Sequence, residues 1–304
     1  MLTLTEIGER ARQVEPALRK LGVAQKNRGL ERAARLLVEK SGDILKANAL
    51  DIETAKANHM NPGLVDRLLL SGARIEGMAE GFTQLASLDD PVGEVISMKK
   101  RPNGLLIGQK RVPLGVVGII YEARPNVTAD AFGLCFKTGN AVILKGGSDA
   151  IHSNRATVEV IREALVSEGI PGDSIQLIES TDRETTTAFM KMNDYVDVLI
   201  PRGGAGLIKA VVNNSTIPVI ETGTGNCHIF VDASANLDMA VDIIFNAKTQ
   251  RIGVCNACES LVVHSEIAQR LLPAMKKRLD EKQVEIRGDE KVCASIEGIV
   301  PAQE

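Results

Sequence analysis

The sequence contains no tryptophan, and aromatic residues of all kinds make up only 3% of its 304 residues. Proteins that bind single-stranded nucleic acid usually stack bases on aromatic side chains. With a net charge of −3, the sequence also lacks the excess of lysine and arginine that binding to a phosphate backbone requires. The one basic run, Lys99-Lys100-Arg101, has no aromatic neighbours and is interpreted as a solvated turn. We therefore expect no nucleic-acid partner.

Long apolar runs are also missing. The longest, Val116 to Ile120 with its neighbours, is far shorter than the ~20 residues that cross a bilayer. The N-terminal segment MLTLTEIGER lacks the apolar core and small-residue cleavage site of a secretory signal. The five cysteines form an odd set without the spacing of a disulfide framework. We therefore expect no membrane association and a location in the reducing cytoplasm.

The first hundred residues are rich in helix-forming residues and carry apolar side chains at helical spacing, for example from Leu4 to Leu18. Pro16 should bend or interrupt that helix. No chemistry is visible here, so this part is expected to be a helical layer packed on the rest. Two Val- and Ile-rich runs follow around Pro102-Asn103-Gly104, which predicts a hairpin at residues 93–113. Such a hairpin could lie at an edge of the fold or reach toward a partner chain.

Strand and helix patterns then alternate, which predicts an α/β fold with a doubly wound parallel sheet. The predicted strands cover residues 116–121, 141–144, 174–178, 196–200 and 217–221. The helices between them are expected at 128–138, 152–167, 185–192 and 203–213. A second α/β unit is expected to begin at about residue 225. The predicted domains are therefore 1–224, which binds a cofactor and includes the hairpin, and 225–304.

Two glycine-rich turns follow predicted strands. Lys145-Gly146-Gly147-Ser148 offers a cation and backbone N–H groups to an anionic nucleotide, and Gly203-Gly204 would let the backbone approach a pyrophosphate. Each turn alone could equally be a plain strand-to-helix connection. No acidic residue follows the first strand to bind a ribose 2′-hydroxyl, and Lys145 with Ser148 suits a 2′-phosphate, which favours NADP over NAD.

A further candidate lies in Tyr121-Glu-Ala-Arg-Pro-Asn126, after another predicted strand. Arg124 could bind a carboxylate or phosphate with two hydrogen bonds, and Asn126 could donate to an oxyanion. A turn whose helix is capped by Asn126 or Thr128 is an equally good interpretation.

Cys255 has the features of a nucleophile. Small and amide residues surround it, and Lys248 and Arg251 precede it, which favours the thiolate. Cys255 and Cys258 form a CxxC pair, but no second pair or suitably spaced histidines accompany them as zinc ligands. We therefore expect no metal site, and we interpret Cys258, like Cys135, as a buried structural residue.

Five ordered motifs resemble the gamma-glutamyl phosphate reductase family of the aldehyde dehydrogenase superfamily. They are VPLGVVGIIYEARPNVT (112–128), ILKGG (143–147), LIPRGGAGL (199–207), STIPVIETGTGNCH (215–228) and NAKTQR followed by VCNA (246–257). The resemblance implies an aldehyde dehydrogenase-like fold and selects Cys255 as the nucleophile, because a family glutamate precedes that cysteine at about the interval from Glu221. It also implies NADPH-dependent reduction of L-glutamate 5-phosphate to L-glutamate 5-semialdehyde in proline biosynthesis, by a homo-oligomer.

The site residues expected on these grounds fall into three groups. The catalytic residues are Cys255 and Asn126; the cofactor-binding residues are Lys145, Gly147, Ser148, Gly203, Gly204 and Glu221; the substrate-binding residues are Arg124, Arg251 and Asn256.

Two departures from the family pattern bear on activity. The nucleophile loop reads Arg251-Ile252-Gly253 where the family has Arg-Pro-Ser, which should loosen the loop. The family's chains are also considerably longer, so the second domain is expected to be incomplete. The alternatives are a non-phosphorylating aldehyde dehydrogenase that depends on Glu221, or a truncated chain that holds NADP without turnover.

Overall fold

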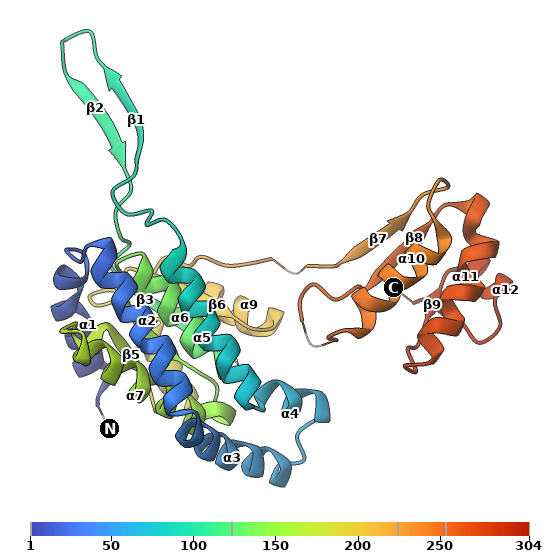
Figure 1. The fold of residues 1–304 in the computed structure, drawn as a ribbon, viewed down its shortest axis with the longest axis horizontal. Helices are drawn as coiled ribbons and strands as arrows, with labels where there is room; N and C mark the ends of the chain where they lie inside the picture. The colour runs from blue at the N-terminus through green and yellow to red at the C-terminus, as the bar shows by residue number, and fades with distance from the viewer. Residues whose placement is uncertain (1, 123, 224, 253, 304) are drawn as a thin grey trace. The chain divides into compact units, whose positions relative to one another are not determined.

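The computed structural model describes residues 2–122, 124–223, 225–252 and 254–303. The chain divides into two compact units, Met1–Thr222 and Gly223–Glu304 (Figure 1). Each unit has its own cluster of buried apolar side chains, so the two are described separately.

Helices open the first unit. They are α1 (Leu4–Leu18), α2 (Val23–Glu39), α3 (Ser41–Ala57), α4 (Pro62–Leu68) and α5 (Gly72–Ser87). A capping box begins α1: Thr3 Oγ1 accepts from the Glu6 backbone N–H at 3.2 Å, and the Glu6 carboxylate accepts from the Thr3 N–H at 2.7 Å. The helix runs through Pro16 without interruption, because the proline lies in the last turn and removes a single hydrogen bond there.

An antiparallel hairpin follows, formed by β1 (Val95–Lys100) and β2 (Leu106–Lys110). The turn between them contains Asn103, whose Oδ1 accepts from the Leu105 N–H at 3.2 Å, and Gly104, whose φ of +89° favours glycine. Nearly all residues of both strands are exposed, so the hairpin is held by its own backbone pairing.

The centre of the first unit is a parallel sheet with strand order β5-β4-β3-β6. Its strands are β3 (Val116–Tyr121), β4 (Ala141–Lys145), β5 (Ile175–Leu177) and β6 (Val198–Arg202). The connecting helices are α6 (Asn126–Lys137), α7 (Ile151–Ser167), α8 (Arg183–Phe189) and α9 (Ala205–Asn214), with short 3₁₀ turns at Ser148–Ala150 and Gly172–Ser174. β3 and β4 are buried at every position, as expected for a sheet covered on both faces.

The doubly wound topology places a switch point between β3 and β6. From β3 the chain moves outward to β4 and β5, and it then returns to pair β6 with the other side of β3. In such sheets ligands bind outside the carboxyl ends of the strands, where the connections diverge.

The predicted strand at residues 217–221 is wrong. The segment makes one isolated bridge, Leu199 to Val219, with hydrogen bonds from the Leu199 N–H to the Pro218 carbonyl at 2.8 Å and from the Ile220 N–H to the Leu199 carbonyl at 2.9 Å. The adjacent bonds of a parallel ladder would need N–H groups from Pro218 and Pro201. Prolines have none, so the pairing cannot extend in either direction.

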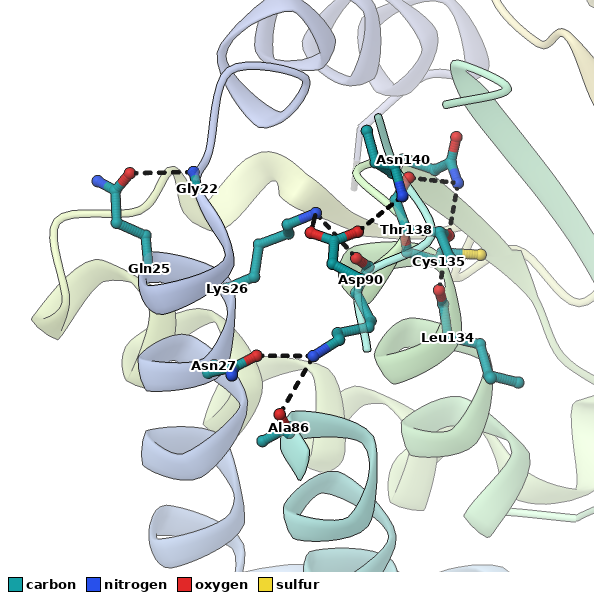
Figure 2. A network of polar contacts seen from close by, with 12 residues as sticks. Gly22, Gln25, Lys26, Asn27, Ala86, Asp90, Leu134, Cys135, Thr138 and Asn140 are labelled. Atoms are coloured by element: carbon teal, nitrogen blue, oxygen red, sulfur yellow. Dashed lines mark hydrogen bonds and ion pairs between the residues drawn. The ribbon is translucent and has the colours of Figure 1, made fainter. Parts of the chain in front are cut away.

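A buried polar cluster joins α2 to the chain just before the hairpin (Figure 2). Lys26 is 1% exposed; its ammonium pairs with the Asp90 carboxylate and donates to the Lys137 carbonyl at 3.0 Å. The Lys137 ammonium donates to Asn27 Oδ1 at 2.8 Å and to the Ala86 carbonyl at 3.2 Å. Burial lowers the pKa of Lys137, and the Asp90 charge opposes this effect. Asp90 therefore balances two buried cations.

The second unit is a smaller α/β arrangement. It contains β7 (His228–Val231), α10 (Leu237–Thr249), β8 (Ser260–Val263), α11 (Ser265–Asp280), β9 (Arg287–Gly288), α12 (Glu290–Ser295) and β10 (Val300–Pro301). β7 and β8 pair in parallel, with His228 opposite Ser260, and α10 packs against α11. The core side chains are Val231, Ala240, Ile244, Ile267, Leu271, Leu272, Met275 and Leu279.

Two features are absent from the described part of the chain. None of the helices there is long and apolar enough to cross a membrane. Within the same residues, no group of three or more histidine, cysteine, aspartate or glutamate side chains could hold a metal ion.

Candidate active site

The carboxyl edge of the first unit's sheet collects most of the predicted cofactor residues. β3, β4 and β6 end side by side, with Ile120 opposite Lys145 and Tyr121 opposite Arg202. The two glycine-rich turns follow β4 and β6 directly, so the sheet register brings them to the same edge.

Lys145 is a buried cation at this edge. It is 5% exposed, and its ammonium donates to the carbonyl of the next residue, Gly146, at 3.1 Å. Among the described residues, no carboxylate lies within ion-pair distance of it. Burial lowers the pKa of Lys145, opposed by the charge of Asp182. Hydrogen bonds from Ser180 and from the Thr185 backbone lower the pKa of Asp182 to about 2, so that this opposing charge is permanent at neutral pH.

Gly146 sits against a buried polar chain. A Cβ at this position would lie 2.4 Å from Asn154 Nδ2 and 3.1 Å from Tyr121 Cζ, so a larger residue would push the turn away from the sheet. Thr128 Oγ1 hydrogen-bonds Tyr121 Oη at 2.7 Å and Asn154 Oδ1 at 2.8 Å. Asn154 Nδ2 is buried without a partner among the described residues. The turn is thus held at Gly146 by its close contact with this buried polar chain. Gly147 is half-buried and Ser148 is exposed.

A distant aspartate caps the helix that follows this turn. Asp51 of α3 is 2% exposed and accepts from the backbone N–H groups of His152 at 3.2 Å and Ser153 at 2.8 Å. The Ser153 hydroxyl also donates to it, at 2.5 Å. The residue at the N-cap of α7, Ala150, provides no side-chain cap of its own. Asp51 therefore occupies the positive end of α7, which removes that helix terminus as a phosphate site.

The turn after β6 contacts Glu122, a residue that the sequence analysis did not identify. Gly204 is the N-cap of α9, and its N–H donates to Glu122 Oε2 at 3.0 Å. A Cβ on Gly203 would lie 2.7 Å from Glu122 Cδ, so glycine allows the carboxylate to lie against the backbone. Glu122 belongs to the quoted motif after β3, but nothing in that local pattern indicates a contact across the switch point.

Arg124 and Asn126 lie at the start of α6. Arg124 is half-buried, and its backbone N–H donates to the Glu122 carbonyl at 2.7 Å. Asn126 is the first residue of α6, and its Nδ2 donates to Asp130 Oδ2 at 3.0 Å. An amide nitrogen carries two hydrogens, so this bond leaves Asn126 one N–H for another acceptor. Ala123, which precedes Arg124 in the sequence, lies outside the described residues.

The predicted nucleophile belongs to the second unit. Of the five cysteines, all of which the structure describes, Cys255 is the exposed one. Burial raises the pKa of Cys258, and it raises the pKa of Cys135 to about 12, so both thiols are poor nucleophiles at neutral pH. Cys227 is half-buried, and its Sγ donates to the Cys255 carbonyl at 3.4 Å.

The other residues proposed around Cys255 are exposed with it. Arg251 and Asn256 are both at the surface of the loop between α10 and β8. The Lys248 ammonium donates to the Cys258 carbonyl at 2.9 Å, and this bond ties the end of α10 to the far side of the loop. Gly253, the departure noted in the sequence, lies outside the described residues. Glu221 is exposed and belongs to the first unit.

The edge of the first sheet fits a dinucleotide. A buried ammonium without a carboxylate in contact is stabilised when an external anion binds it. At the other turn, the nearest described atoms to a Cβ on Gly204 would be the Glu122 carboxylate oxygens at 3.7 and 3.9 Å, so glycine leaves room at this backbone for an acidic group.

This is the architecture of a dinucleotide-binding α/β protein. Residues 3–295 match the aldehyde dehydrogenase family, whose members use NAD(P). A gamma-glutamyl phosphate reductase from Lachnospira eligens is 59% identical over 304 residues, which are 100% of this chain and 73% of that protein. The chain therefore belongs to the aldehyde dehydrogenase family, in its gamma-glutamyl phosphate reductase branch.

Solved structures agree with this placement. The crystal structure of gamma-glutamyl phosphate reductase from Thermotoga maritima matches with a TM-score of 0.88 and 46% identity, over 99% of this chain and 73% of that one. A propionaldehyde dehydrogenase from Clostridium phytofermentans shares the fold, with a TM-score of 0.70 at 17% identity over 96% of this chain and 62% of that one. The predicted α/β, aldehyde dehydrogenase-like fold is thereby confirmed.

Proposed function

We propose that this chain catalyses the NADPH-dependent reduction of L-glutamate 5-phosphate to L-glutamate 5-semialdehyde, with release of phosphate, as a step of proline biosynthesis. The relatives named gamma-glutamyl phosphate reductase support the reaction class, since they match along the whole chain. The observation that carries the chemistry is the exposure of Cys255, because a nucleophilic thiol must be reachable by its substrate.

Cys255 would act by covalent catalysis. Its thiolate attacks the carbonyl carbon of the acyl phosphate, the bond from that carbon to the phosphate oxygen breaks, and phosphate leaves with the electron pair. A thioester on Cys255 remains. When bound, NADPH supplies the hydride that reduces this thioester. Hydride addition leaves the alkoxide of a thiohemiacetal, and its collapse breaks the carbon–sulfur bond, releases the aldehyde and returns Cys255 to the thiolate.

The other proposed residues bind and orient. Lys145 and Ser148 would hold the 2′-phosphate of NADPH, and the backbone at Gly147, Gly203 and Gly204 would approach the cofactor closely. The remaining N–H of Asn126 and backbone N–H groups near Cys255 would stabilise the oxyanion. Arg124, Arg251 and Asn256 would bind the substrate's phosphate and carboxylate groups.

Glu221 has a lesser role in this proposal. In an aldehyde dehydrogenase that releases an acid, a glutamate at this position would activate water against the thioester. A reductase that releases an aldehyde needs no such water, so Glu221 is assigned a cofactor contact. The cytoplasmic location, the homo-oligomer and the domain limits stay predictions from the sequence.

The test is phosphate-dependent oxidation of glutamate semialdehyde by the 304-residue chain, followed as NADPH appearance. Cys255→Ala should lower turnover roughly a thousandfold or more while NADPH binding is retained. Cys258→Ala is the matched control and should keep its activity, because that thiol is buried. Activity retained in Cys255→Ala would remove this cysteine from the mechanism. Turnover without phosphate that is lost in Glu221→Gln would identify a non-phosphorylating aldehyde dehydrogenase instead.

A further inference from the structure

One backbone N–H at the switch point has two acceptors assigned to it. In the structure, the Gly204 N–H donates to the Glu122 carboxylate at 3.0 Å. The proposed function brings the cofactor close to the backbone at Gly203 and Gly204, where the same N–H would be the donor to a pyrophosphate oxygen. A single hydrogen cannot serve both acceptors at full strength, so one must leave when the other binds.

The contact between Glu122 and Gly204 is set up by the fold. The Glu122 backbone N–H donates to the Arg202 carbonyl at 3.2 Å, which fixes the residue beside the end of β6. Gly203 leaves room for the carboxylate, since a Cβ there would lie 2.7 Å from Glu122 Cδ. Gly204 itself has no side chain that could cap α9, so Glu122 takes the place of an N-cap side chain.

A second observation at the same edge points to an external anion. The Lys145 ammonium is buried at the end of β4, and no carboxylate among the described residues is in contact with it. The edge therefore holds one unmatched buried cation, while its other anion-binding group is already occupied by Glu122. A dinucleotide with a terminal phosphate and a pyrophosphate would match Lys145 but would have to displace Glu122.

We propose that Glu122 is an intramolecular competitor for the pyrophosphate of the cofactor. This inference rests on the proposed function, because it needs a dinucleotide at the sheet edge. In the cofactor-free chain Glu122 caps α9; on binding, its carboxylate leaves the Gly204 N–H and the pyrophosphate takes its place. Glu122 thereby sets the affinity for the cofactor, since the hydrogen bond that it gives up and the repulsion between two anions both oppose binding.

The test compares dissociation constants by calorimetry on the full chain. Glu122→Ala should bind NADPH about tenfold more tightly than wild type, and Glu122→Gln should lie between the two because it keeps an acceptor without the charge. The affinity of inorganic pyrophosphate, measured by its competition with NADPH, should rise by a similar factor in Glu122→Ala. Adenosine 2′-phosphate lacks the pyrophosphate, so its affinity should stay within about twofold.

Glu76→Ala is the charge-matched control. Glu76 is exposed on α5, so its loss changes the net charge equally and should leave NADPH affinity unchanged. Equal or weaker NADPH binding by Glu122→Ala would overturn the competition, and so would an equal gain for adenosine 2′-phosphate or for Glu76→Ala. If wild type binds NADPH in these cases, the proposed function stands. If wild type binds no NADPH, both proposals fail together.

Discussion

Lys145, the proposed ligand of the cofactor's 2′-phosphate, is a residue whose burial is unfavourable for the fold. A buried ammonium loses its hydration, and the carbonyl of Gly146 replaces only part of it. Burial accordingly lowers the pKa of Lys145. Lys137 is also buried, but it has two hydrogen bonds and the charge of Asp90 nearby. The contrast supports the proposal that Lys145 binds a ligand, whereas Lys137 contributes to the fold.

We therefore predict opposite stability effects for two similar substitutions. Lys145→Met should raise the free energy of unfolding of the cofactor-free chain, because an uncompensated charge leaves the interior, and it should weaken NADPH binding by about tenfold to a hundredfold. Lys137→Met should lower the free energy of unfolding, because it leaves Asp90 with less compensation and Asn27 and Ala86 without their donor. Denaturant unfolding and NADPH titration measure both quantities.

The same prediction has a pH dependence whose sign follows from the lowered pKa. Between the lowered pKa of Lys145 in the folded chain and its ordinary pKa of 10.5, the unfolded chain binds the proton more strongly. The contribution of Lys145 to stability therefore rises with pH in that window, while NADPH affinity falls as the ammonium is lost. Lys145→Met should show neither this rise in stability nor this fall in NADPH affinity with pH. Identical pH profiles for wild type and Lys145→Met would contradict this assignment.

Local sequence points to some candidate residues and gives no sign of others. Cys255 was singled out by its small and cationic neighbours, and it is the exposed thiol of the five. Glu122 was missed because its partner, Gly204, lies 82 residues further along the chain. Asp51 was missed for the same reason, since it acts 102 residues away on Ser153. Contacts of this kind depend on strand order and helix packing, which local patterns do not contain.

At the scale of elements, α7 depends on a cap from another helix. We predict that Asp51→Ala lowers the free energy of unfolding by about 2–3 kcal/mol, because three donors at the start of α7 lose a buried charged acceptor. The turn at Gly147 and Ser148 directly precedes α7, so NADPH affinity should also fall. Thermal unfolding and NADPH titration test the two effects.

Asp43→Ala is the matched control for this prediction. Asp43 lies in the first turn of the same helix, α3, and among the described residues its side chain pairs with Lys46 in an exposed ion pair. Its removal should change stability by about 0.5 kcal/mol or less. If Asp51→Ala were as mild as this control, Asp51 would not be the cap that holds α7.

Strand prediction succeeded where both faces of a strand are buried. Residues 116–121 were predicted from their apolar run, and β3 has the same limits. Residues 217–221 carry a similar run, but Pro218 and, on the facing strand β6, Pro201 lack the N–H groups whose hydrogen bonds would extend the pairing. The pattern of one segment cannot reveal which residue will oppose it, so the second proline could be recognised only from the sheet.

At the scale of the whole molecule, each of the two units has its own core, and each carries different residues of the proposed function. The first unit holds the sheet edge with Lys145, and the second holds Cys255. The chain spans 73% of the length of the relatives from Lachnospira eligens and Thermotoga maritima. The described second unit nevertheless contains a buried cluster on α10, α11 and β7, which gives it apolar burial of its own.

The separate cores predict that each unit can be destabilised alone. Leu271 and Leu37 are both 0% exposed, the first in the core of the second unit and the second in the core of the first. Replacement of either leucine by alanine should lower the free energy of unfolding of its unit by about 2–5 kcal/mol. In calorimetry, Leu271→Ala should lower the transition of the second unit by about 10 °C or more while NADPH binding persists. Leu37→Ala should lower the other transition, which NADPH should raise again by mass action. A single transition that both substitutions shift equally, or loss of NADPH binding in Leu271→Ala, would mean that the two cores unfold as one cooperative unit.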